Sequence, residues 1–440
     1  ERQAELDATY TFAAEQLEMA LAIDGSDREV RRRFAALLHD RAQFAERIYQ
    51  LTERDEQVQR MLAYDDDGAQ RARWNAPAQL AIDSAPARAT VVAQRYVDDR
   101  GLRRLAETVA LGTTPIADAA LAAGSYLLTL RVSGRPEVRA PIAVARGERL
   151  AIRVPVPAEV PPGYVFVPPG RFLYGSIDVE DMRRTMMNAQ PLHPASTDGY
   201  LIGRHEVTFA DWIAFLRDLP AAERSRRRPH TAETAQAHVG AYVDLTEPRP
   251  DSFRLTLQPT SRAYTAEVGQ PIRYGARTVA AEQSWERMPV SGISWDDALA
   301  YAAWLDRSGK LAGARPCNER EWERAARGAD ARPFPHGDRL APADADLAET
   351  YGRKPEAFGP DEVGSHPASN SPFGVADLAG NAWEWVKSMS GDEVVAIRGG
   401  SWYHNLLAAR SNNREPVEPE LRDLAIGLRI CASVTSGDAR

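Results

Sequence analysis

Two short runs near the C-terminal end constrain the fold of this chain more than any other part of its sequence. Residues 380–385 read Gly-Asn-Ala-Trp-Glu-Trp, and residues 398–402 read Arg-Gly-Gly-Ser-Trp. Glycine permits close approach of the backbone, and large aromatic residues beside glycine are typical of a packed core. A third run, Gly-Leu-Arg at 427–429, follows a polar segment. We expect the arginines of these runs to pair with carboxylates and the runs to hold the polar loop 402–426 on a rigid scaffold.

The composition excludes several broad classes of protein. The chain has 440 residues, which is enough for two or three domains, and its net charge is −8. Nucleic acid is not expected as a partner, because phosphate binding needs a concentrated basic surface. No run of about 18 apolar residues occurs, so no membrane-spanning segment is expected. The chain begins at Glu1 without an initiator Met or an apolar leader, which indicates a processed chain or a piece of a longer one.

Cysteine usage bears on the compartment in which the chain works. Only Cys317 and Cys431 are present. Two cysteines exclude a disulfide-rich secreted framework and favour free thiols in a reducing compartment, so we expect a cytoplasmic location. The spacing of the two residues does not support a disulfide between them. The residues still leave that bond, and an extracytoplasmic location, open.

The first 76 residues have a helical pattern. Apolar residues recur at steps of three and four, for example Leu17 with Leu21 and Phe34 with Leu38, and charged residues fill the other face. One stretch, 10–24, resembles a single unit of a tetratricopeptide-type repeat, but no clear second copy follows. The pattern predicts an antiparallel helical hairpin over residues 1–76, of tetratricopeptide-like or coiled-coil type.

From about Ala78 the period changes from helical to alternating. Short apolar runs are separated by glycine and proline, which predicts a small β-sandwich over residues 77–157. The turns at 112–115 (Gly-Thr-Thr-Pro) and 124–126 (Gly-Ser-Tyr) lie where the PEGA family has its own turns. The segment therefore resembles a PEGA domain, and this resemblance implies a spacer or scaffold without a catalytic role.

Residues 158–440 carry a series of motifs in a fixed order. They include Glu-Val-Thr at 206–208, Ser294 with Asp297 before one helix, and Asn318 before another, where both polar residues are predicted N-caps. With the two C-terminal runs, this order resembles the formylglycine-generating-enzyme or sulfatase-modifying-factor family. The resemblance implies an α+β fold of C-type-lectin type. Residues 220–285 form an insertion, strand-like at 253–257, whose role the sequence does not reveal.

The same resemblance raises the question of catalysis. In the oxidases of the family, a pair of cysteines in the loop after Arg-Gly-Gly-Ser binds copper, and soft Cu(I) requires such ligands. Here residues 402–410 contain no cysteine, so formylglycine-generating activity is not expected and neither copper nor iron is expected as a cofactor. A related branch, the ergothioneine-type sulfoxide synthases, uses a His-x-x-x-His-x-Glu iron site. None of the eight histidines has that spacing, but a distributed site from His205, His336, His366 or His404 stays open.

A structural calcium ion is better supported by the resemblance. The places of Asp377, Gly380, Ala382 and Glu384 match a calcium-binding turn of the family, and Ca²⁺ prefers such oxygen ligands. The alternative is that Asp377 and Glu384 only cap and pair inside a buried turn. A second calcium site of the family is half matched. Asp346 and Leu347 align with its first ligands, whereas the later acidic ligand has become Pro355 or has moved to Glu356.

The polar loop after the second run is the candidate binding surface. Its side chains suit recognition on a rigid scaffold, and the alternative is an ordinary solvated loop. The candidate ligand-binding residues are Trp402, Tyr403, His404, Asn405, Arg410, Asn412, Asn413 and Glu415.

These observations together favour a binding function. We expect a non-catalytic domain that binds a protein, peptide or small ligand, as the sensor or docking region of a bacterial signalling protein such as a Ser/Thr kinase. In bacteria this order of helices, PEGA-like module and modifying-factor domain often follows a Ser/Thr kinase, so the resemblance implies a kinase region upstream. No kinase signature is present in this chain itself. One alternative is an oxygen-dependent oxidase or non-heme-iron oxidoreductase. Another is a variable binding protein of a diversity-generating retroelement, with variation at positions such as Tyr403, Asn405 and Asn412.

Overall fold

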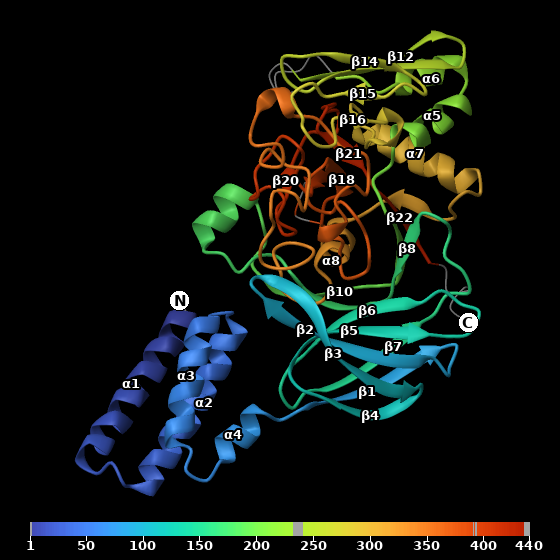
Figure 1. Cartoon of the computed structure of the whole chain (residues 1–440). Coiled ribbons are helices and arrows are strands. Elements are labelled where there is room, and N and C mark those ends of the chain that lie inside the picture. Colours follow the sequence, from blue (N-terminus) through green and yellow to red (C-terminus); the bar gives the residue numbers. More distant parts are fainter. Residues whose placement is uncertain (1, 232–240, 390, 392–393, 435–440) are drawn as a thin grey trace. The chain divides into compact units, whose positions relative to one another are not determined.

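The computed structural model describes residues 2–231, 241–389, 391 and 394–434. His238, one of the eight histidines, lies outside the described residues. The chain divides into two compact units, and Figure 1 labels the helices and strands that they contain. Unit 1 comprises Glu1–Ala81, Ala117–Gly124 and Val144–Ala151, and unit 2 comprises Ile82–Ile116, Ser125–Ala143 and Ile152–Arg440. These units cross the predicted limits at residues 77 and 157, so the three predicted domains remain predictions.

The N-terminal part contains more helices than the predicted hairpin. Within the described residues of 1–76 the helices are α1 (Arg2–Ile23), α2 (Arg28–Arg47), α3 (Leu51–Tyr64) and the short α4 (Ala69–Trp74). Asp27 caps α2, because its side chain accepts hydrogen bonds from the backbone N–H groups of Glu29 and Val30. Phe34, Leu38 and Met61 form the buried centre of this bundle. The predicted N-terminal helices are confirmed, and α3 adds a third long helix to the expected pair.

Strands follow directly, as the alternating pattern predicts. One sheet has the order β4-β1-β7 and a second has the order β3-β2-β5-β6. Their bounds are β1 Ala78–Ala85, β2 Thr90–Asp99, β3 Leu102–Thr113, β4 Ile116–Leu121, β5 Gly124–Arg131, β6 Val138–Val144 and β7 Arg149–Pro155. In unit 2 the second sheet is tied to the C-terminal region, because Arg139 Nε donates to the carbonyl of Pro372 at 2.8 Å. The likeness to a PEGA domain remains a prediction.

Short strands and helices build the C-terminal part of unit 2. The sheet β17-β22-β11-β8 and the sheet β20-β19-β18-β21 form its centre, beside the β10-β9 pair. The strands are β8 Tyr164–Val167, β9 Gly170–Tyr174, β10 His193–Thr197, β11 Tyr200–Gly203, β17 Ala314–Pro316, β18 Trp383–Lys387, β19 Val395–Arg398, β20 Glu415–Pro416, β21 Ile426–Leu428 and β22 Ile430–Ser433. The helices are α5 Phe209–Arg217, α6 Ala221–Arg227, α7 Trp295–Arg307 and α8 Glu319–Arg327, with the short turns η1 Met182–Met186, η2 Trp285–Arg287, η3 Pro355–Ala357 and η4 Pro367–Ser369.

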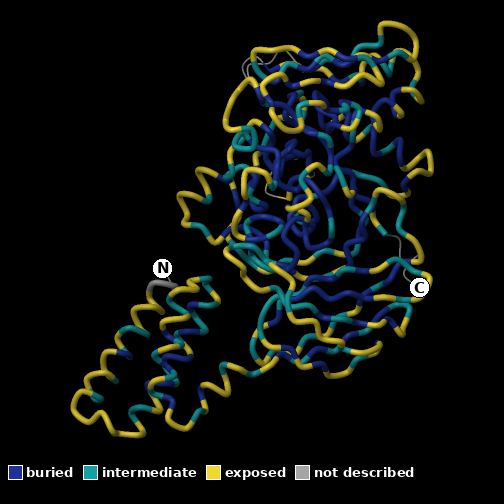
Figure 2. The backbone as a smooth tube through the Cα atoms, viewed as in Figure 1, coloured by how far each residue is buried: buried dark blue, intermediate teal, exposed yellow. Residues whose placement is uncertain are grey.

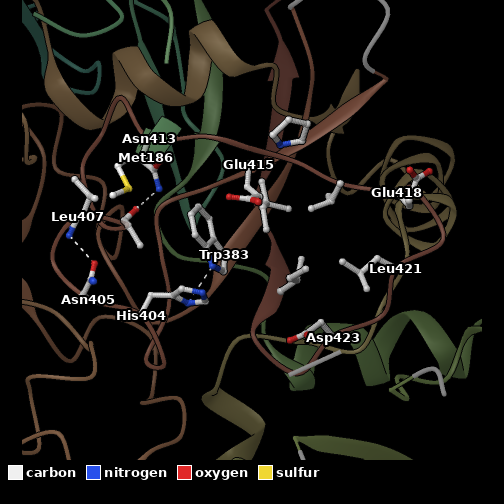
Figure 3. Close-up of a pocket in the computed structure, with 15 residues that line it drawn as sticks. Met186, Trp383, His404, Asn405, Leu407, Asn413, Glu415, Glu418, Leu421 and Asp423 are labelled. Carbon is white, nitrogen blue, oxygen red and sulfur yellow. Dashed lines mark hydrogen bonds between the residues drawn. The ribbon is translucent and has the colours of Figure 1, made fainter. Parts of the chain in front are cut away.

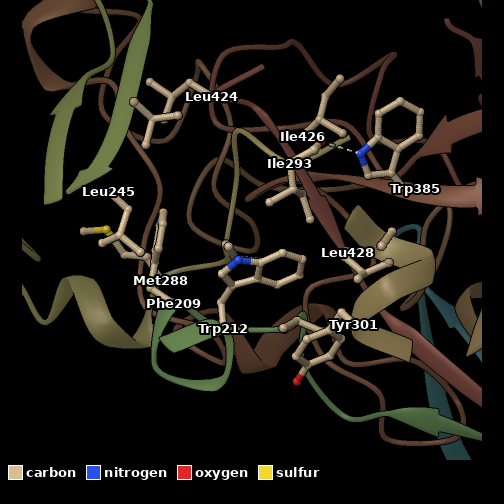
Figure 4. Close-up of a cluster of buried hydrophobic side chains, with 14 of the residues drawn as sticks. Phe209, Trp212, Leu245, Met288, Ile293, Tyr301, Trp385, Leu424, Ile426 and Leu428 are labelled. Carbon is tan, nitrogen blue, oxygen red and sulfur yellow. Dashed lines mark hydrogen bonds between the residues drawn. The ribbon is translucent and has the colours of Figure 1, made fainter. Parts of the chain in front are cut away.

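Strand pairing brings the two C-terminal runs together. β18 pairs antiparallel with β19 and parallel with β21, so Glu384 lies opposite both Arg398 and Gly427. Trp385 is fully buried, Trp383 nearly so, and the Trp385 indole donates to the carbonyl of Ile293 at 3.0 Å. Figure 4 shows Trp385 in the large apolar cluster with Trp212 and other buried side chains. The predicted core role of both tryptophans is confirmed.

Local signals at the two predicted helix starts are also confirmed. Ser294 and Asp297 form a capping box at α7, and Asn318 forms one with Glu321 at α8. In each box the N-cap side chain accepts a backbone N–H three residues ahead, while the acidic side chain accepts the N–H of the cap residue. All residues of α8 except the half-buried Arg320 are buried, so these caps fix the orientation of a helix in the core.

The described residues of the insertion 220–285 are folded and contribute to the core. It contributes β12 (Tyr242–Arg249), β13 (Ser252–Gln258) and β14 (Tyr264–Glu267), which form a sheet in that order, and the pair β15 (Ile272–Arg273) and β16 (Glu282–Gln283). Its inward side chains join the large apolar cluster. They include Val243, Leu245, Phe253, Leu255 and Leu257. The predicted strand at 253–257 is confirmed, and in Figure 2 buried segments alternate with exposed ones along this end of unit 2.

The two cysteines are joined, contrary to the expected free thiols. Cys317 and Cys431 form a disulfide with a Cα–Cα distance of 4.8 Å. The pairing of β17 with β22 places Arg315 opposite Cys431, so the start of α8 lies beside the last strand. The prediction of a reducing compartment rested on free thiols, and it loses this basis because the two cysteines form a disulfide. Among the described helices, none has the length and apolar character needed to span a membrane.

Candidate functional site

A pocket of about 580 Å³ lies between the C-terminal runs and the loop that joins them (Figure 3). Its floor includes Trp383 from β18 and Ile397 from β19. Met186 at the end of η1 also reaches the pocket, and the other described lining residues lie in the loop 402–426. Of the candidate ligand-binding residues, those that line the pocket are His404, Asn405, Asn413 and Glu415. The size lies in the range typical of small-ligand or side-chain pockets.

Trp383 and His404 are held in a fixed relation. The Trp383 indole donates to His404 Nδ1 at 3.2 Å, and Ser401 Oγ lies 2.8 Å from the same nitrogen. The two rings are nearly perpendicular, with centroids 5.4 Å apart. Because an indole N–H can only donate, Nδ1 must accept, and the proton of a neutral His404 lies on Nε2. The imidazole is therefore positioned by Trp383 and Ser401 at the edge of the pocket.

The remaining candidate loop residues do not share one environment. Tyr403 is 41% exposed, whereas Trp402 is 1% and Asn412 2% exposed. Arg410 pairs with Asp178 at 2.8 Å and does not line the pocket. The expected polar surface is not continuous, because Trp402 and Asn412 are buried outside the pocket lining, whereas the buried Asn413 contributes to that lining. Their segment turns inward, since the Ser411 N–H donates to the carbonyl of Pro333 at 2.7 Å.

Carboxylates dominate the charge of the pocket. Glu415 and Glu418 are exposed on one side, and the buried Asp423 lies below them, where its Oδ1 accepts the N–H of Ala425 at 2.7 Å. Partial burial raises the pKa of Glu415 above its ordinary value. No Lys or Arg is present among the described residues that line the pocket. The pocket therefore favours a positively charged group over a negative one.

A buried ionic network beneath the loop keeps the pocket rigid. Arg398 pairs with Glu319 at 3.2 Å and with Glu323 at 2.8 Å, both on α8. Arg398 also donates to the carbonyl of Ser411 at 3.0 Å, and Arg414 pairs with Glu319 at 2.6 Å. These groups are almost fully buried, and all except Arg398 Nε make hydrogen bonds, so loss of one partner would leave an uncompensated charge. The predicted pairing of Arg398 with a carboxylate is confirmed.

The first predicted calcium turn lies away from the pocket lining. Glu384 is fully buried, accepts three hydrogen bonds from Arg429, the shortest at 2.7 Å, and accepts one from the Trp322 indole at 2.6 Å. Asp377 has a φ of +57° and its Oδ2 accepts the N–H of Gly364 at 2.5 Å. Gly380 and Ala382 are buried in the same turn. The predicted pairing of Arg429 with a carboxylate is confirmed.

Sequence reasoning missed a third carboxylate at this turn. Glu206 is buried, its Oε2 has no hydrogen-bond partner, and it lies 3.6 Å from Arg429. Burial, and then the charge of Asp377, raise its pKa well above the ordinary value. Three buried carboxylates thus face one guanidinium, an imbalance that suits an added cation. Among the described residues, however, no three or more His, Cys, Asp or Glu side chains already converge as a metal site does.

The second predicted calcium turn carries its own positive charges. Asp346 is buried and neither side-chain oxygen has a hydrogen-bond partner, while Leu347 is held by Thr350. Burial raises the pKa of Asp346 well above its ordinary value, and the negative charge of the neighbouring Asp361 raises it further. The expected ligand at Pro355 or Glu356 is therefore not the acidic neighbour. No motif in the sequence indicated that Asp361 would be the acidic neighbour of Asp346.

Arg277 and His366 neutralise that turn. The Arg277 guanidinium donates to Asp361 at 2.5 Å and to the carbonyls of Ala357 and Gly359 at 2.7 and 2.5 Å. Burial alone would lower the pKa of His366, but its hydrogen bond to Asp361 raises that pKa to about 9. Two carboxylates and two protein cations balance, so these residues do not fit an additional metal ion. Arg277 comes from the insertion, which gives that segment a structural role.

The histidines that sequence reasoning left open do not gather at one point. His404 lines the pocket, His336 contacts Asp344 at 3.2 Å, and His366 contacts Asp361. His205 lies 3.6 Å from Asp377 at the first turn. A redox site built from these four together is not formed by the described residues.

Comparisons with known proteins agree with this architecture. A family model described as the sulfatase-modifying factor enzyme 1-like domain matches residues 152–434. A hercynine oxygenase of Mycolicibacterium thermoresistibile is 29% identical over 292 residues, covering 60% of this chain and 57% of that protein. The mouse (Mus musculus) protein called inactive C-alpha-formylglycine-generating enzyme 2 is 29% identical over 256 residues, covering 55% of this chain and 74% of that protein.

Solved structures are similar to part of this chain. PvdO from Pseudomonas aeruginosa gives a TM-score of 0.44 at 24% identity, covering 62% of this chain and 94% of that chain. Treponema denticola variable protein 1 gives 0.41 at 17% identity, covering 61% and 94%. The family model, together with the helices and strands of the same residues, confirms the predicted α+β fold of the sulfatase-modifying-factor family. This chain spans little more than half the length of the hercynine oxygenase that it matches.

Proposed function

This chain belongs to the family of sulfatase-modifying factor enzyme 1-like domains, and we propose that it is a non-catalytic member that binds a protein or peptide in the pocket beside Trp383. One observation carries the proposal. The loop between the two family motifs lines an open pocket of about 580 Å³ that contains no cysteine, while both cysteines of the chain form a disulfide elsewhere. A rigid pocket with a polar and aromatic lining suits recognition.

The chemistry of the lining supports binding over copper-dependent oxidation. Cu(I) prefers thiolate or thioether ligands, and a cysteine tied in a disulfide cannot supply a thiolate. The only sulfur among the described lining residues is that of Met186, which is 60% exposed. One relative is named as an inactive formylglycine-generating enzyme, and we place this chain in the same functional class.

The wider setting follows from the same proposal. A binding domain with helices and a PEGA-like module before it suits the sensor or docking region of a bacterial signalling protein, with a Ser/Thr kinase region upstream. The disulfide supports an oxidising, extracytoplasmic compartment in place of the reducing one that the cysteine count favoured. Alkylation of the unfolded chain purified without reductant tests this point, because the proposal predicts no labelled cysteine and labelling of both would contradict it.

Calcium is proposed as a structural ion at the first turn only. Glu206, Asp377 and Glu384 surround a single arginine, and the unsatisfied Glu206 Oε2 shows that the buried charge is not balanced. Asp377 and Glu384, with the backbone carbonyls of the turn, would hold the ion, and Ca²⁺ suits an oxygen-only set. The ion would stabilise the turn that carries Trp383.

An oxidoreductase function is the second candidate, because two kinds of observation favour it. His404 lines the pocket, and relatives of this chain are named hercynine oxygenases. The pocket offers only this one imidazole among the described lining residues, so a metal there would need further ligands from a substrate. Oxygen consumption by the chain with Fe(II) or Cu(I) and a bound peptide would favour this candidate.

A variable binding protein is less well supported. Variation at Tyr403 or Asn405 would change exposed side chains, but Asn412 is buried beside Met187. Buried positions tolerate few side chains, because a change of volume strains the core.

Selection of a displayed random-peptide library on the folded chain tests the proposed function. The variant Ala408→Trp fills the pocket from its lining, and Ala222→Trp on the exposed start of α6 is the control of equal size. We expect the wild type and the control to enrich a common peptide class that Ala408→Trp does not bind. Equal enrichment on all three proteins, or turnover of the peptide with oxygen, would overturn the proposal.

A further inference from the structure

We infer that the pocket beside Trp383 selects a basic side chain, lysine or arginine, carried on a peptide. This inference rests on the proposed function and specifies what the pocket takes. The pocket combines a carboxylate rim, an aromatic wall and an apolar lining. Lysine and arginine side chains have the matching parts, since a cationic head ends an apolar stem.

The charge of the rim is not matched within the pocket. The exposed Glu415 and Glu418 carry this charge, with the buried Asp423 below them, and no cationic Lys or Arg lines the cavity in the described part of the chain. The exposed carboxylates of Glu415 and Glu418 make no ion pair within the described residues. Figure 3 shows these three acids on one side of Trp383, and His404, Asn405 and Leu407 on the other. A cation entering here meets carboxylates without displacing a protein cation.

The arginines of the same loop are directed elsewhere. Each forms an ion pair with a carboxylate that does not line the pocket, so none neutralises the rim. The pairs are Arg410 with Asp178 at 2.8 Å, Arg414 with Glu319 at 2.6 Å and Arg422 with Asp297 at 2.5 Å. The loop thus separates its positive charges, which brace the scaffold, from negative charges that face the cavity.

The uncharged lining distinguishes a side chain from a bare metal ion. Leu407, Val417 and Leu421 give the pocket apolar surface that a methylene stem can cover, and Trp383 can attract a cation through its ring. A hydrated metal ion would leave this surface in contact with water. Asn413, which is fixed by donating to the carbonyl of Ala408 at 3.0 Å, adds a polar group to the lining.

The cationic group that enters the pocket could belong to a peptide side chain or to a free amine. We commit to the peptide, because the rim residues Glu415 and Glu418 are exposed and leave room for a main chain to continue past the cavity. Guanidinium and ammonium heads share the recognition chemistry, although guanidinium also forms bidentate pairs with carboxylates.

Fluorescence anisotropy with labelled peptides of Gly and Ser that differ at one central residue tests the inference. The central residue is arginine, lysine, citrulline or norleucine, and agmatine serves as a free competitor. We expect the arginine peptide to bind at least about tenfold more tightly than the citrulline peptide, and the difference to shrink in high salt. Glu415→Gln with Glu418→Gln should remove the preference, whereas Glu420→Gln, exposed on the same loop but outside the lining, should retain it.

The outcomes separate this inference from the proposed function. Equal binding of arginine and citrulline peptides would overturn the cation inference, while library peptides blocked by Ala408→Trp would still support a binding pocket. Agmatine that binds as tightly as the arginine peptide would overturn the choice of a peptide. Loss of the preference in Glu420→Gln as well would also overturn it, because the rim would not be the cause. Circular dichroism confirms that each variant is folded before binding is compared.

Discussion

The pocket rim and the turn that joins Asp346 to Asp361 are both acidic, but they differ in what balances the charge. At the turn, Arg277 and His366 supply two protein cations in contact with Asp361. At the rim, Glu415 and Glu418 face solvent without a cation in the described lining. A buried carboxylate must be paired with a partner inside the fold, whereas water stabilises an exposed carboxylate that is free to bind a ligand. The difference separates acids that hold the structure together from acids available for binding.

The largest expected effect comes from removing the cation at the turn. Arg277→Gln leaves Asp361 and Asp346 buried without a guanidinium, and we expect a loss of about 3–5 kcal/mol in the free energy of unfolding. Urea denaturation measures the loss. Arg273→Gln, exposed on β15 of the same insertion, is the control and should change stability little. If Arg277→Gln lowers the free energy of unfolding by no more than the control does, the acids of the turn do not depend on a protein cation and the contrast with the pocket rim fails.

The pH dependence of stability tests the second cation. The pKa of His366 is raised to about 9 in the folded chain, so its contribution is complete below the unfolded pKa and is lost as pH rises through about 9. The contribution amounts to at most about 3 kcal/mol. Unfolding curves between neutral and alkaline pH should show this loss in the wild type and a flatter profile in His366→Gln. Parallel profiles would show that His366 carries no charge there.

Chelation examines a third acidic cluster, the turn with Asp377 and Glu384. If calcium balances its excess charge, a chelator should remove about 2 to 3 kcal/mol of stability, as expected for an ion at about 100 times its Kd. Asp377→Asn should abolish the difference between melting with calcium and with chelator, and the exposed Asp198→Asn should keep it. Melting curves of the wild type that are identical with calcium and with chelator would contradict the proposal that calcium binds at this turn.

The smallest effect is expected at the rim itself. Glu415→Gln and Glu418→Gln remove charges that no described residue pairs, so stability should change by less than about 0.5 kcal/mol. The same urea measurement applies. A loss comparable with that in Arg277→Gln would place these two residues among the structural acids and erase the contrast between the regions.

The sequence predicted local features well, because they depend on neighbours in the chain. The caps at Ser294 and Asn318 need only residues three positions ahead. The pairing of Arg398 with a carboxylate was also expected, since a cation beside buried glycine and tryptophan must be neutralised. The identity of its partners was not, because Glu319 and Glu323 lie far away in sequence and meet it only through the packing of α8.

Features that depend on tertiary contacts escaped sequence reasoning. The disulfide joins residues 114 positions apart through a strand pairing that no local signal reveals. Asn412 lies in a stretch whose polar composition is typical of a solvated loop. It is nevertheless buried, because the neighbouring backbone forms hydrogen bonds with segments that are distant in sequence. Arg277 lies in an insertion without a recognisable motif. Its role is visible only once its contact with Asp361 is known.

The most direct test of the central claim is an NMR titration of the indole N–H signals with the arginine peptide. The chain has nine tryptophans, and the signal of Trp383 is assigned by its loss in Trp383→Phe. The account predicts that this signal shifts with the arginine peptide, that the citrulline peptide leaves it in place, and that Glu415→Gln with Glu418→Gln suppresses the shift. An unmoved Trp383 signal, or equal shifts with both peptides, would contradict the assignment of this pocket to basic side chains.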